Sequence, residues 1–260
     1  MNGARATRHR ALLLSSTALT LSFVLLLSLF IASHLTRSSH RHHATYSGDF
    51  TRIEVTVNGA ATVAGSARSS VRAEWDLSWS LSRPRVEARA EGGALRLSVS
   101  CPGMPGRGCS SSTVLSVPAH ARVQVSADEG VRVRGVRGGL SARTRGGDVA
   151  LDDVRGHVEA RTREGRIEAT GLSGRTVEAA SRDGSVRLAF ARPPRTVDVA
   201  TRDGHASLAL PRVAGGYAVR TGGGTAAARV TAPTNPGSAR SVTVRSRDTQ
   251  IRVATTAPAN

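Results

Sequence analysis

Apolar and polar residues alternate strictly through the C-terminal half of the chain, in short segments such as VEART and RIEAT. Alternation with a period of two predicts β-strands that bury one face and expose the other. The segments come in pairs, and a corner that contains glycine separates the two members of each pair. We therefore expect two half-buried strands in every repeat.

The repeats align on a Ser or Thr that precedes the corner. Apolar residues occupy the positions two and four before it and five and seven after it in every copy, as in the column Val158, Val177 and Val197. A pair of short strands cannot bury its apolar face alone, but stacked pairs can. The pattern predicts an all-β, single-domain β-solenoid, similar to a parallel β-helix, with repeats of about 18–20 residues. The aligned positions are Thr144, Thr162, Ser181, Thr201, Thr221 and Ser246.

The corner has the form Ser/Thr-Arg-acidic-Gly in several copies, as in SRDG and TRDG. We expect the glycine to supply a positive φ, and Asp183 and Asp203 to bond nearby backbone N–H groups. The alternative is that the two aspartates are paired catalytic carboxylates. The last copy has Thr249 in place of glycine, which predicts that it caps the stack.

Segments upstream of the repeats, including FTRIEVTVNGAATVAG, also alternate and predict earlier, less regular strands. We expect Trp75 and Trp79 to cover the first exposed pair of strands, because a bare sheet edge templates pairing with other chains. Cys101 and Cys109 bracket the loop PGMPGRG. In an oxidising compartment they are expected to form a disulfide; a two-ligand metal half-site and free thiols are the alternatives.

The N-terminal segment between Arg10 and Arg37 contains no Arg, Asp or Glu and includes LSFVLLLSLFIASHL. Its length and polarity predict a membrane-spanning helix, and the arginines before it favour a cytoplasmic N-terminus. A cleaved signal peptide is the alternative. We expect a cytoplasmic tail at 1–10, a single-pass plasma-membrane anchor at 11–36, a His-rich linker at 37–47 and an extracytoplasmic domain at 48–256. Metal binding by His40, His42 and His43 is the alternative to a solvated linker.

The chain has 36 basic and 19 acidic residues, a formal net charge of +17, and every basic residue is arginine. Such a charge favours polyanionic partners, although a solubilising role is the alternative. No aromatic residues are interleaved for base stacking, so no nucleic acid partner is expected. The candidate polyanion-binding residues are Arg145, Arg163, Arg182 and Arg202 at the corners, and Arg192, Arg195, Arg212 and Arg240 in the variable loops opposite.

The segment VPAHARVQVSADEGVRV and the T-x-x-G corners that follow it resemble a bacterial family of putative adhesins of unknown function. The resemblance covers roughly 50–253 and implies a cell-surface β-solenoid behind one membrane helix, with no catalytic residues to transfer. The chain departs from the pattern at Gly222, Gly223 and Thr249.

We expect a membrane-anchored surface binding or scaffold module that needs no cofactor and contacts anionic envelope polymers or another surface protein. A polysaccharide-active enzyme is the alternative, with Asp152, Asp153 and Asp198 as candidate acids. Their surroundings are arginines and surface turns, so we expect no enzyme.

Overall fold

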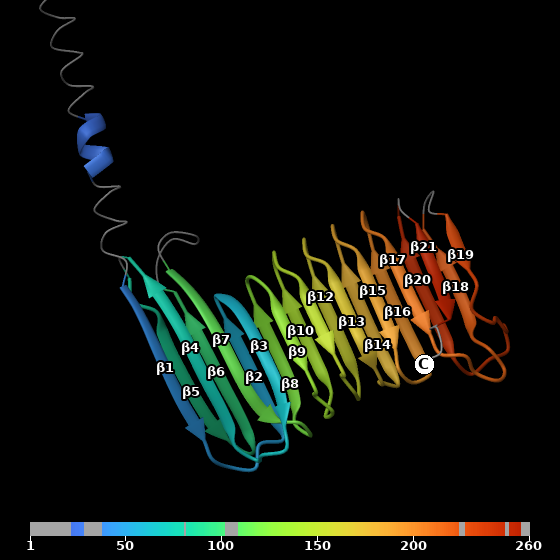
Figure 1. Ribbon diagram of the computed structural model, residues 1–260, viewed down its shortest axis with the longest axis horizontal. Helices are drawn as coiled ribbons and strands as arrows, with labels where there is room; N and C mark the ends of the chain where they lie inside the picture. The colour runs from blue at the N-terminus through green and yellow to red at the C-terminus, as the bar shows by residue number, and fades with distance from the viewer. Residues whose placement is uncertain are drawn as a thin grey trace, which may run out of the picture.

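The computed structural model describes residues 22–28, 38–80, 82–101, 109–223, 227–247 and 250–255. Apart from a short helix at 22–28, the regular structure of these residues is all β, which confirms the all-β part of the predicted fold class. The strands form two large sheets that face each other along an elongated body (Figure 1). Most neighbouring strands are parallel, and antiparallel pairs occur only at the N-terminal end of the described stack.

Sheet A contains eleven strands among the described residues, and sheet B contains ten. In spatial order, sheet A comprises β1 (Ser38–Tyr46), β4 (Val71–Trp79), β7 (Cys109–Pro118), β3 (Gly59–Ser66), β9 (Val131–Arg134), β11 (Val149–Asp152), β13 (Ile167–Leu172), β15 (Val186–Phe190), β17 (Ala206–Leu210), β21 (Ile251–Thr255) and β19 (Ala228–Val230). Sheet B comprises β18 (Ala218–Gly222), β20 (Ser241–Ser246), β16 (Thr196–Thr201), β14 (Thr176–Ser181), β12 (Val158–Thr162), β10 (Leu140–Thr144), β8 (Arg122–Ala127), β2 (Arg52–Val57), β6 (Ala94–Ser100) and β5 (Arg85–Glu91).

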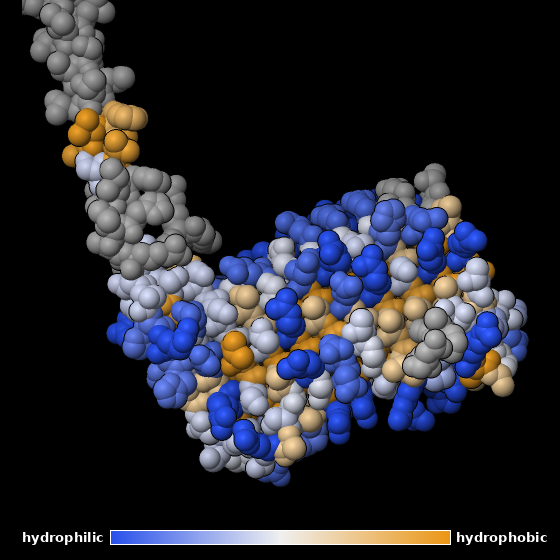
Figure 2. All heavy atoms as spheres, in the orientation of Figure 1, coloured by the Kyte–Doolittle hydropathy of each residue, from blue (hydrophilic) through white to orange (hydrophobic). Residues whose placement is uncertain are grey.

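The apolar columns of the sequence form the core between the sheets. Val158, Val177 and Val197 pair in register on β12, β14 and β16, and each is 1% exposed. The residues that alternate with them along each strand point to solvent. Figure 2 shows hydrophilic side chains along both margins of the visible face, with an apolar band between them. We call one strand of each sheet, together with the corner that joins them, a rung. The predicted stacking of the columns is confirmed.

The last rung in the sequence does not end the stack. β20 lies between β16 and β18, and β21 lies between β17 and β19, so the prediction of a cap at this rung is wrong. The physical reason is burial: Val242, Val244, Ile251 and Val253 are at most 1% exposed and need neighbours on both sides. β18 and β19, which are largely exposed, form the outer rung instead.

This insertion also changes the register of the repeat. Thr221 pairs with Val244 rather than with Ser246, so β18 is shifted by two residues from its alignment in the sequence. Ser246 instead pairs with Thr201, which belongs to the rung two copies earlier in the chain. Spatial order and chain order therefore differ at this end of the molecule.

The N-terminal end of the stack also departs from chain order, because β2 lies between β8 and β6, and β3 lies between β7 and β9. Trp75 is fully buried on β4, and Trp79 packs against the core with Arg83 5.6 Å from its ring centre. Neither lies on the outermost strand: β1 and β5 form the two edges. The tryptophans lie near this end of the stack, but the prediction that they cover its exposed edge is wrong, because β1 pairs with the outer side of β4.

The expected His-rich linker is in fact largely strand β1, which pairs antiparallel with β4 from Ser38 to Tyr46. Its side chains are mostly exposed, and His42 stacks on Trp75 with the ring centres 5.4 Å apart. An edge strand is held by backbone hydrogen bonds to a single neighbour, so β1 forms although it has few apolar residues. Among the described residues, no cluster of three or more metal-ligating side chains is present.

Only 22–28 of the expected membrane anchor lies in the described part of the chain. These residues are helical, and Phe23, Val24, Leu25 and Leu26 are exposed. Within the described ranges, no helix has the length and apolar character needed to cross a bilayer. The expected cytoplasmic tail and the rest of the anchor lie outside the described residues.

Candidate functional site

The corner that follows each strand of sheet B is held by the hydroxyl group that aligns the repeats. Ser181 Oγ accepts a hydrogen bond from Gly184 N–H at 2.9 Å and donates one to the Gly165 carbonyl of the preceding rung at 2.8 Å. Thr162 and Thr201 make the same pair of contacts with their own and the preceding glycine. Buried hydroxyl groups thus link each corner to its neighbour.

The corner glycines are needed for a different reason from the one predicted. Gly147, Gly165, Gly184 and Gly204 do not have positive φ, so the prediction on this point is wrong. A Cβ atom built on Gly184 would lie 1.9 Å from the Gly165 carbonyl oxygen, and the other three are equally crowded. The close approach of the preceding rung excludes a side chain. The hydroxyls, rather than Asp183 and Asp203, bond the corner N–H groups.

Fixed corners place one arginine per rung on the same margin of sheet B. The residues that precede Arg163, Arg182, Arg202 and Arg247 pair in register, and the Arg202 N–H donates to the Arg182 carbonyl. We call these four, together with Arg145 at the preceding corner, the arginine ladder. Arg247 was not among the predicted site residues, because the sequence order separates it from Arg202 by the Gly222 copy. The insertion of β20 beside β16 closes that gap.

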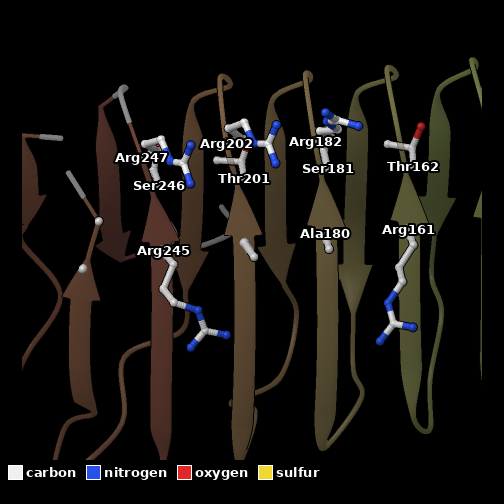
Figure 3. A pocket seen from close by; sticks show the side chains of 13 residues that line it. Arg161, Thr162, Ala180, Ser181, Arg182, Thr201, Arg202, Arg245, Ser246 and Arg247 are labelled. Carbon is white, nitrogen blue, oxygen red and sulfur yellow. The ribbon is translucent and has the colours of Figure 1, made fainter. Parts of the chain in front are cut away.

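A groove of about 610 Å³ lies beneath the C-terminal part of this ladder, on the outer face of sheet B (Figure 3). Its floor includes Ala180 and Ala200, which stand where neighbouring strands carry Arg161 and Arg245. The ladder residues Arg182, Arg202 and Arg247 line the margin at the corners. We call this feature the arginine groove. Its volume falls within the range of about 300–1,000 Å³ that is typical of small-molecule sites.

The arginines around the groove differ in how far their charge is compensated. Arg161 Nη1 lies 2.6 Å from a Glu159 carboxylate oxygen, and Arg245 Nη2 lies 2.7 Å from Asp198 Oδ1. Arg182 is 3.9 Å from Asp183. Among the described residues, no carboxylate lies within ion-pair distance of Arg202. The ladder therefore carries the less compensated positive charge.

Glu159 belongs to a row of carboxylates on sheet B that continues with Glu178 and Asp198. Burial raises the pKa of the Glu159 carboxyl, but the hydrogen bond from Ser141 and the charges of Arg143 and Arg161 lower it more, so its pKa lies below the ordinary value. The row lies two residues before Arg161, Ala180 and Ala200 along the strands, on the same face. The carboxylates do not line the groove; they lie roughly 7 Å beyond its floor, on the side away from the arginine ladder.

The other predicted arginines do not join this site. Arg192, Arg195, Arg212 and Arg240 lie at the opposite margin, where the second corner of each rung is found. Arg240 donates hydrogen bonds to the Pro194 and Pro193 carbonyls at 3.1 and 3.5 Å, and thereby ties two loops together. At the other end of the ladder, Arg145 pairs with Asp128 at 3.2 Å.

The candidate catalytic acids do not converge. Asp152 ends β11 in sheet A and accepts a hydrogen bond from Thr170 Oγ1 at 2.9 Å, whereas Asp198 lies on β16 in sheet B. Asp153, with φ of 46°, occupies the corner after β11. Asp183 and Asp203 are exposed at successive corners of the ladder. No pair among these five has the shared, enclosed setting that acid–base catalysis by carboxylates requires.

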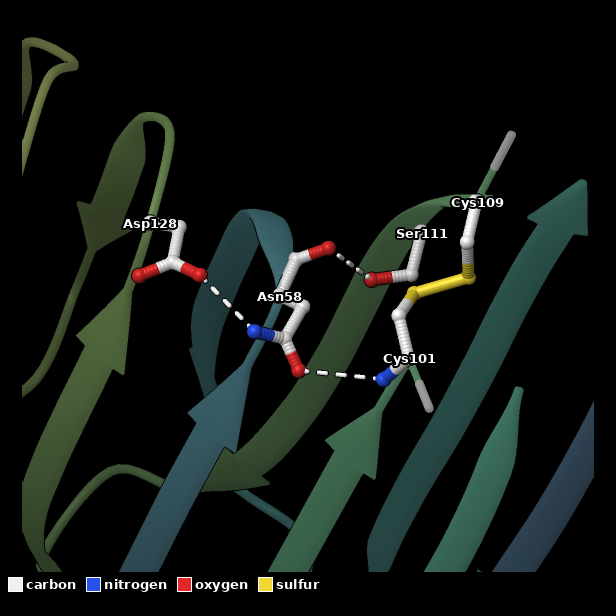
Figure 4. The surroundings of a disulfide bond; sticks show 5 residues. All are labelled: Asn58, Cys101, Cys109, Ser111 and Asp128. Carbon is white, nitrogen blue, oxygen red and sulfur yellow. Dashed lines mark hydrogen bonds between the residues drawn. A yellow bond between two sulfur atoms is a disulfide. The ribbon is translucent and has the colours of Figure 1, made fainter. Parts of the chain in front are cut away.

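Cys101 and Cys109 form the predicted disulfide, with their Cα atoms 6.0 Å apart (Figure 4). Asn58, which was not among the predicted site residues, joins three rungs beside it. Its amide nitrogen donates to Asp128 at 2.8 Å, its amide oxygen accepts from Cys101 N–H at 3.2 Å, and its carbonyl accepts from Ser111 at 2.9 Å. The sequence NG after an alternating strand is the only local signal for this role.

No protein-family model matches the chain, and no curated protein matches it. Among solved structures, it is similar to a putative lipid binding protein from Parabacteroides distasonis (TM-score 0.49, 11% identity, covering 82% of this chain and 97% of that one). It is also similar to a putative adhesin from the same species (TM-score 0.45, 12% identity, 84% and 97%). A third is a putative cell adhesion protein from Clostridium sporogenes (TM-score 0.36, 11% identity, 84% and 100%).

Proposed function

We propose that this chain is a single-pass membrane protein that holds a β-solenoid of the adhesin-like type outside the plasma membrane, where it binds anionic envelope polymers. Parallel pairing of equivalent residues on successive rungs supports the solenoid. The apolar run at 11–36 and the arginines before it support the anchor and its orientation. The disulfide supports an oxidising, extracytoplasmic compartment.

The observation that carries the binding role is the arginine ladder. The backbones of successive rungs lie roughly 4.8 Å apart, so the guanidinium groups that they carry repel one another, and an anionic ligand that lies along them relieves the repulsion. Arginine pairs with carboxylate, sulfate and phosphate groups through two parallel hydrogen bonds. A rigid row of such groups fits a polymer that repeats its charge.

The test is binding of the full chain, in detergent, to immobilised heparin and to a teichoic-type polymer over a range of salt concentrations. We expect affinity to fall steeply with salt. Replacing Arg163, Arg182, Arg202 and Arg247 with serine should reduce the slope of log affinity against log salt by about one unit for each arginine removed.

The matched control removes the same charge from the other face: Arg132, Arg187, Arg229 and Arg252 lie on outward positions of sheet A. We expect this variant to keep most of the affinity. Equal loss in both variants would mean that net charge alone drives binding. Binding that does not respond to salt would contradict the proposed function.

A further inference from the structure

We propose that the arginine groove binds an acidic polysaccharide, with one sugar ring seated on Ala180 and Ala200 and its anionic edge turned toward the arginine ladder. This inference rests on the proposed function and adds the class of polymer and its orientation. It is carried by three features: the apolar floor of the groove, the different charge of the surface on either side of the floor, and the two arginines that flank it.

The floor is apolar because two successive strands carry alanine where the strands on either side carry arginine. The column runs Arg143, Arg161, Ala180, Ala200 and Arg245, in register from β10 to β20. Figure 3 shows Ala180 between the long side chains of Arg161 and Arg245, and Ala200 pairs in register with Ala180 on the next strand. These two arginines stand three strand spacings apart, or about 14 Å. The gap accommodates a ring, and its methyl groups favour a ligand with an apolar face.

The surface on the two sides of the floor carries opposite charge, and the arginine side is the one that lines the groove. Arg182, Arg202 and Arg247 line the side near the corners, and the carboxylates Glu178 and Asp198 lie two residues back along the same strands. A ligand that is anionic all round, such as polyphosphate, would face these carboxylates and be repelled. An acidic sugar presents carboxylate or sulfate on one edge and hydroxyl groups on the other, and hydroxyl groups can donate to Glu178 and Asp198.

Arg161 and Arg245 flank the two alanines of the floor. Both are held in place by carboxylates of the row, through contacts of 2.6 Å to Glu159 and of 2.7 and 2.9 Å to Asp198. Their side chains remain 50% and 56% exposed, so each still offers N–H donors to a ligand. The groove therefore combines an apolar floor with a few fixed polar groups, as small-molecule sites do.

The decisive experiment fills the floor while adding positive charge. We compare the full chain with the variant Ala180→Arg/Ala200→Arg for binding to a heparin oligosaccharide and to inorganic polyphosphate of matched charge, by calorimetry at fixed salt. The fold accepts arginine in this column, since Arg143, Arg161 and Arg245 already occupy it. The native chain should bind the oligosaccharide about tenfold more tightly than polyphosphate, a difference of about 1.4 kcal/mol.

In the double-arginine variant we expect oligosaccharide affinity to fall about tenfold and polyphosphate affinity to rise. A second variant, Ala180→Gln/Ala200→Gln, fills the floor without charge and should weaken oligosaccharide binding as well. Neutralising the carboxylate side with Glu178→Gln/Asp198→Asn should strengthen polyphosphate binding more than oligosaccharide binding.

Tighter binding of both probes by the double-arginine variant would overturn this inference, because it would show that the ligand does not occupy the floor. The proposed function would survive that result. If the native chain bound neither probe, the proposed function would fail and this inference with it. Circular dichroism of each variant checks that the β-sheet content is unchanged.

Discussion

Glycine recurs at the first corner of each rung because the carbonyl oxygen of the preceding rung lies where its side chain would be. The same carbonyl oxygen accepts a hydrogen bond from the Ser or Thr of the next rung. The short distance that excludes a side chain therefore also permits this hydrogen bond. The sequence shows that glycine is required at these positions, but it does not distinguish a positive φ from a steric limit. The stacking distance between rungs decides the matter.

Replacing Gly184 with alanine tests the steric explanation. Its Cβ would overlap the Gly165 backbone, and we expect the free energy of unfolding to fall by about 1–3 kcal/mol, as overpacking does. The matched control is Gly222→Ala, where no atom lies within 4 Å of the added Cβ. That variant should change stability by no more than about 0.5 kcal/mol. Urea denaturation measures both, and equal effects would contradict the steric explanation.

Strand alternation in the sequence predicts the elements well, because each strand has one buried face and the period of two is written into the residues. The columns through Val158, Val177 and Val197 were predictable for the same reason. The order of the rungs at the C-terminal end of the stack was not predictable from the sequence. The residues of β20 do not by themselves indicate that this strand lies between β16 and β18. Its position follows from burial, because the apolar strands gain most when they have a neighbour on both sides.

Hydrogen exchange of backbone amides tests this order of strands. We expect the amides of β20 (Ser241–Ser246) to exchange more slowly than those of β18 (Ala218–Gly222), by about tenfold or more, because β20 is interior and β18 is an edge. If the rungs were stacked in chain order, β20 would be the outer strand and the ranking would be reversed. Measurement by mass spectrometry on the native chain distinguishes the two orders.

Across the whole molecule, each rung contacts only its neighbours, so stability is distributed locally along the stack. The two ends are fixed by different means. The disulfide and Asn58 tie β2, β6, β7 and β8 together at one end, whereas the other end is bounded by the short strands β18 and β19. The location of the disulfide was predictable from its loop, but its cooperation with Asn58 was not, because it depends on the interleaving of β2.

Reduction of the disulfide tests this local distribution. We expect reduction to speed amide exchange in β6 and β7 and, through Asn58, in β2, because the loop between the cysteines is no longer closed. The strands β14 to β17 should keep their protection to within about threefold. Uniform loss of protection along the stack would mean that the chain unfolds as one cooperative unit.

The hydroxyl-to-carbonyl contacts at the corners have a consequence for how such a molecule can lengthen. The segment from one corner hydroxyl to the next brings its own donor and leaves an identical acceptor for whatever follows. Tandem duplication of that segment would insert a new layer while its neighbours kept every partner they had. A segment that carries a corner arginine, such as the one that contains Arg182, would bring its guanidinium group with it, so one duplication would lengthen both the body and its charged margin.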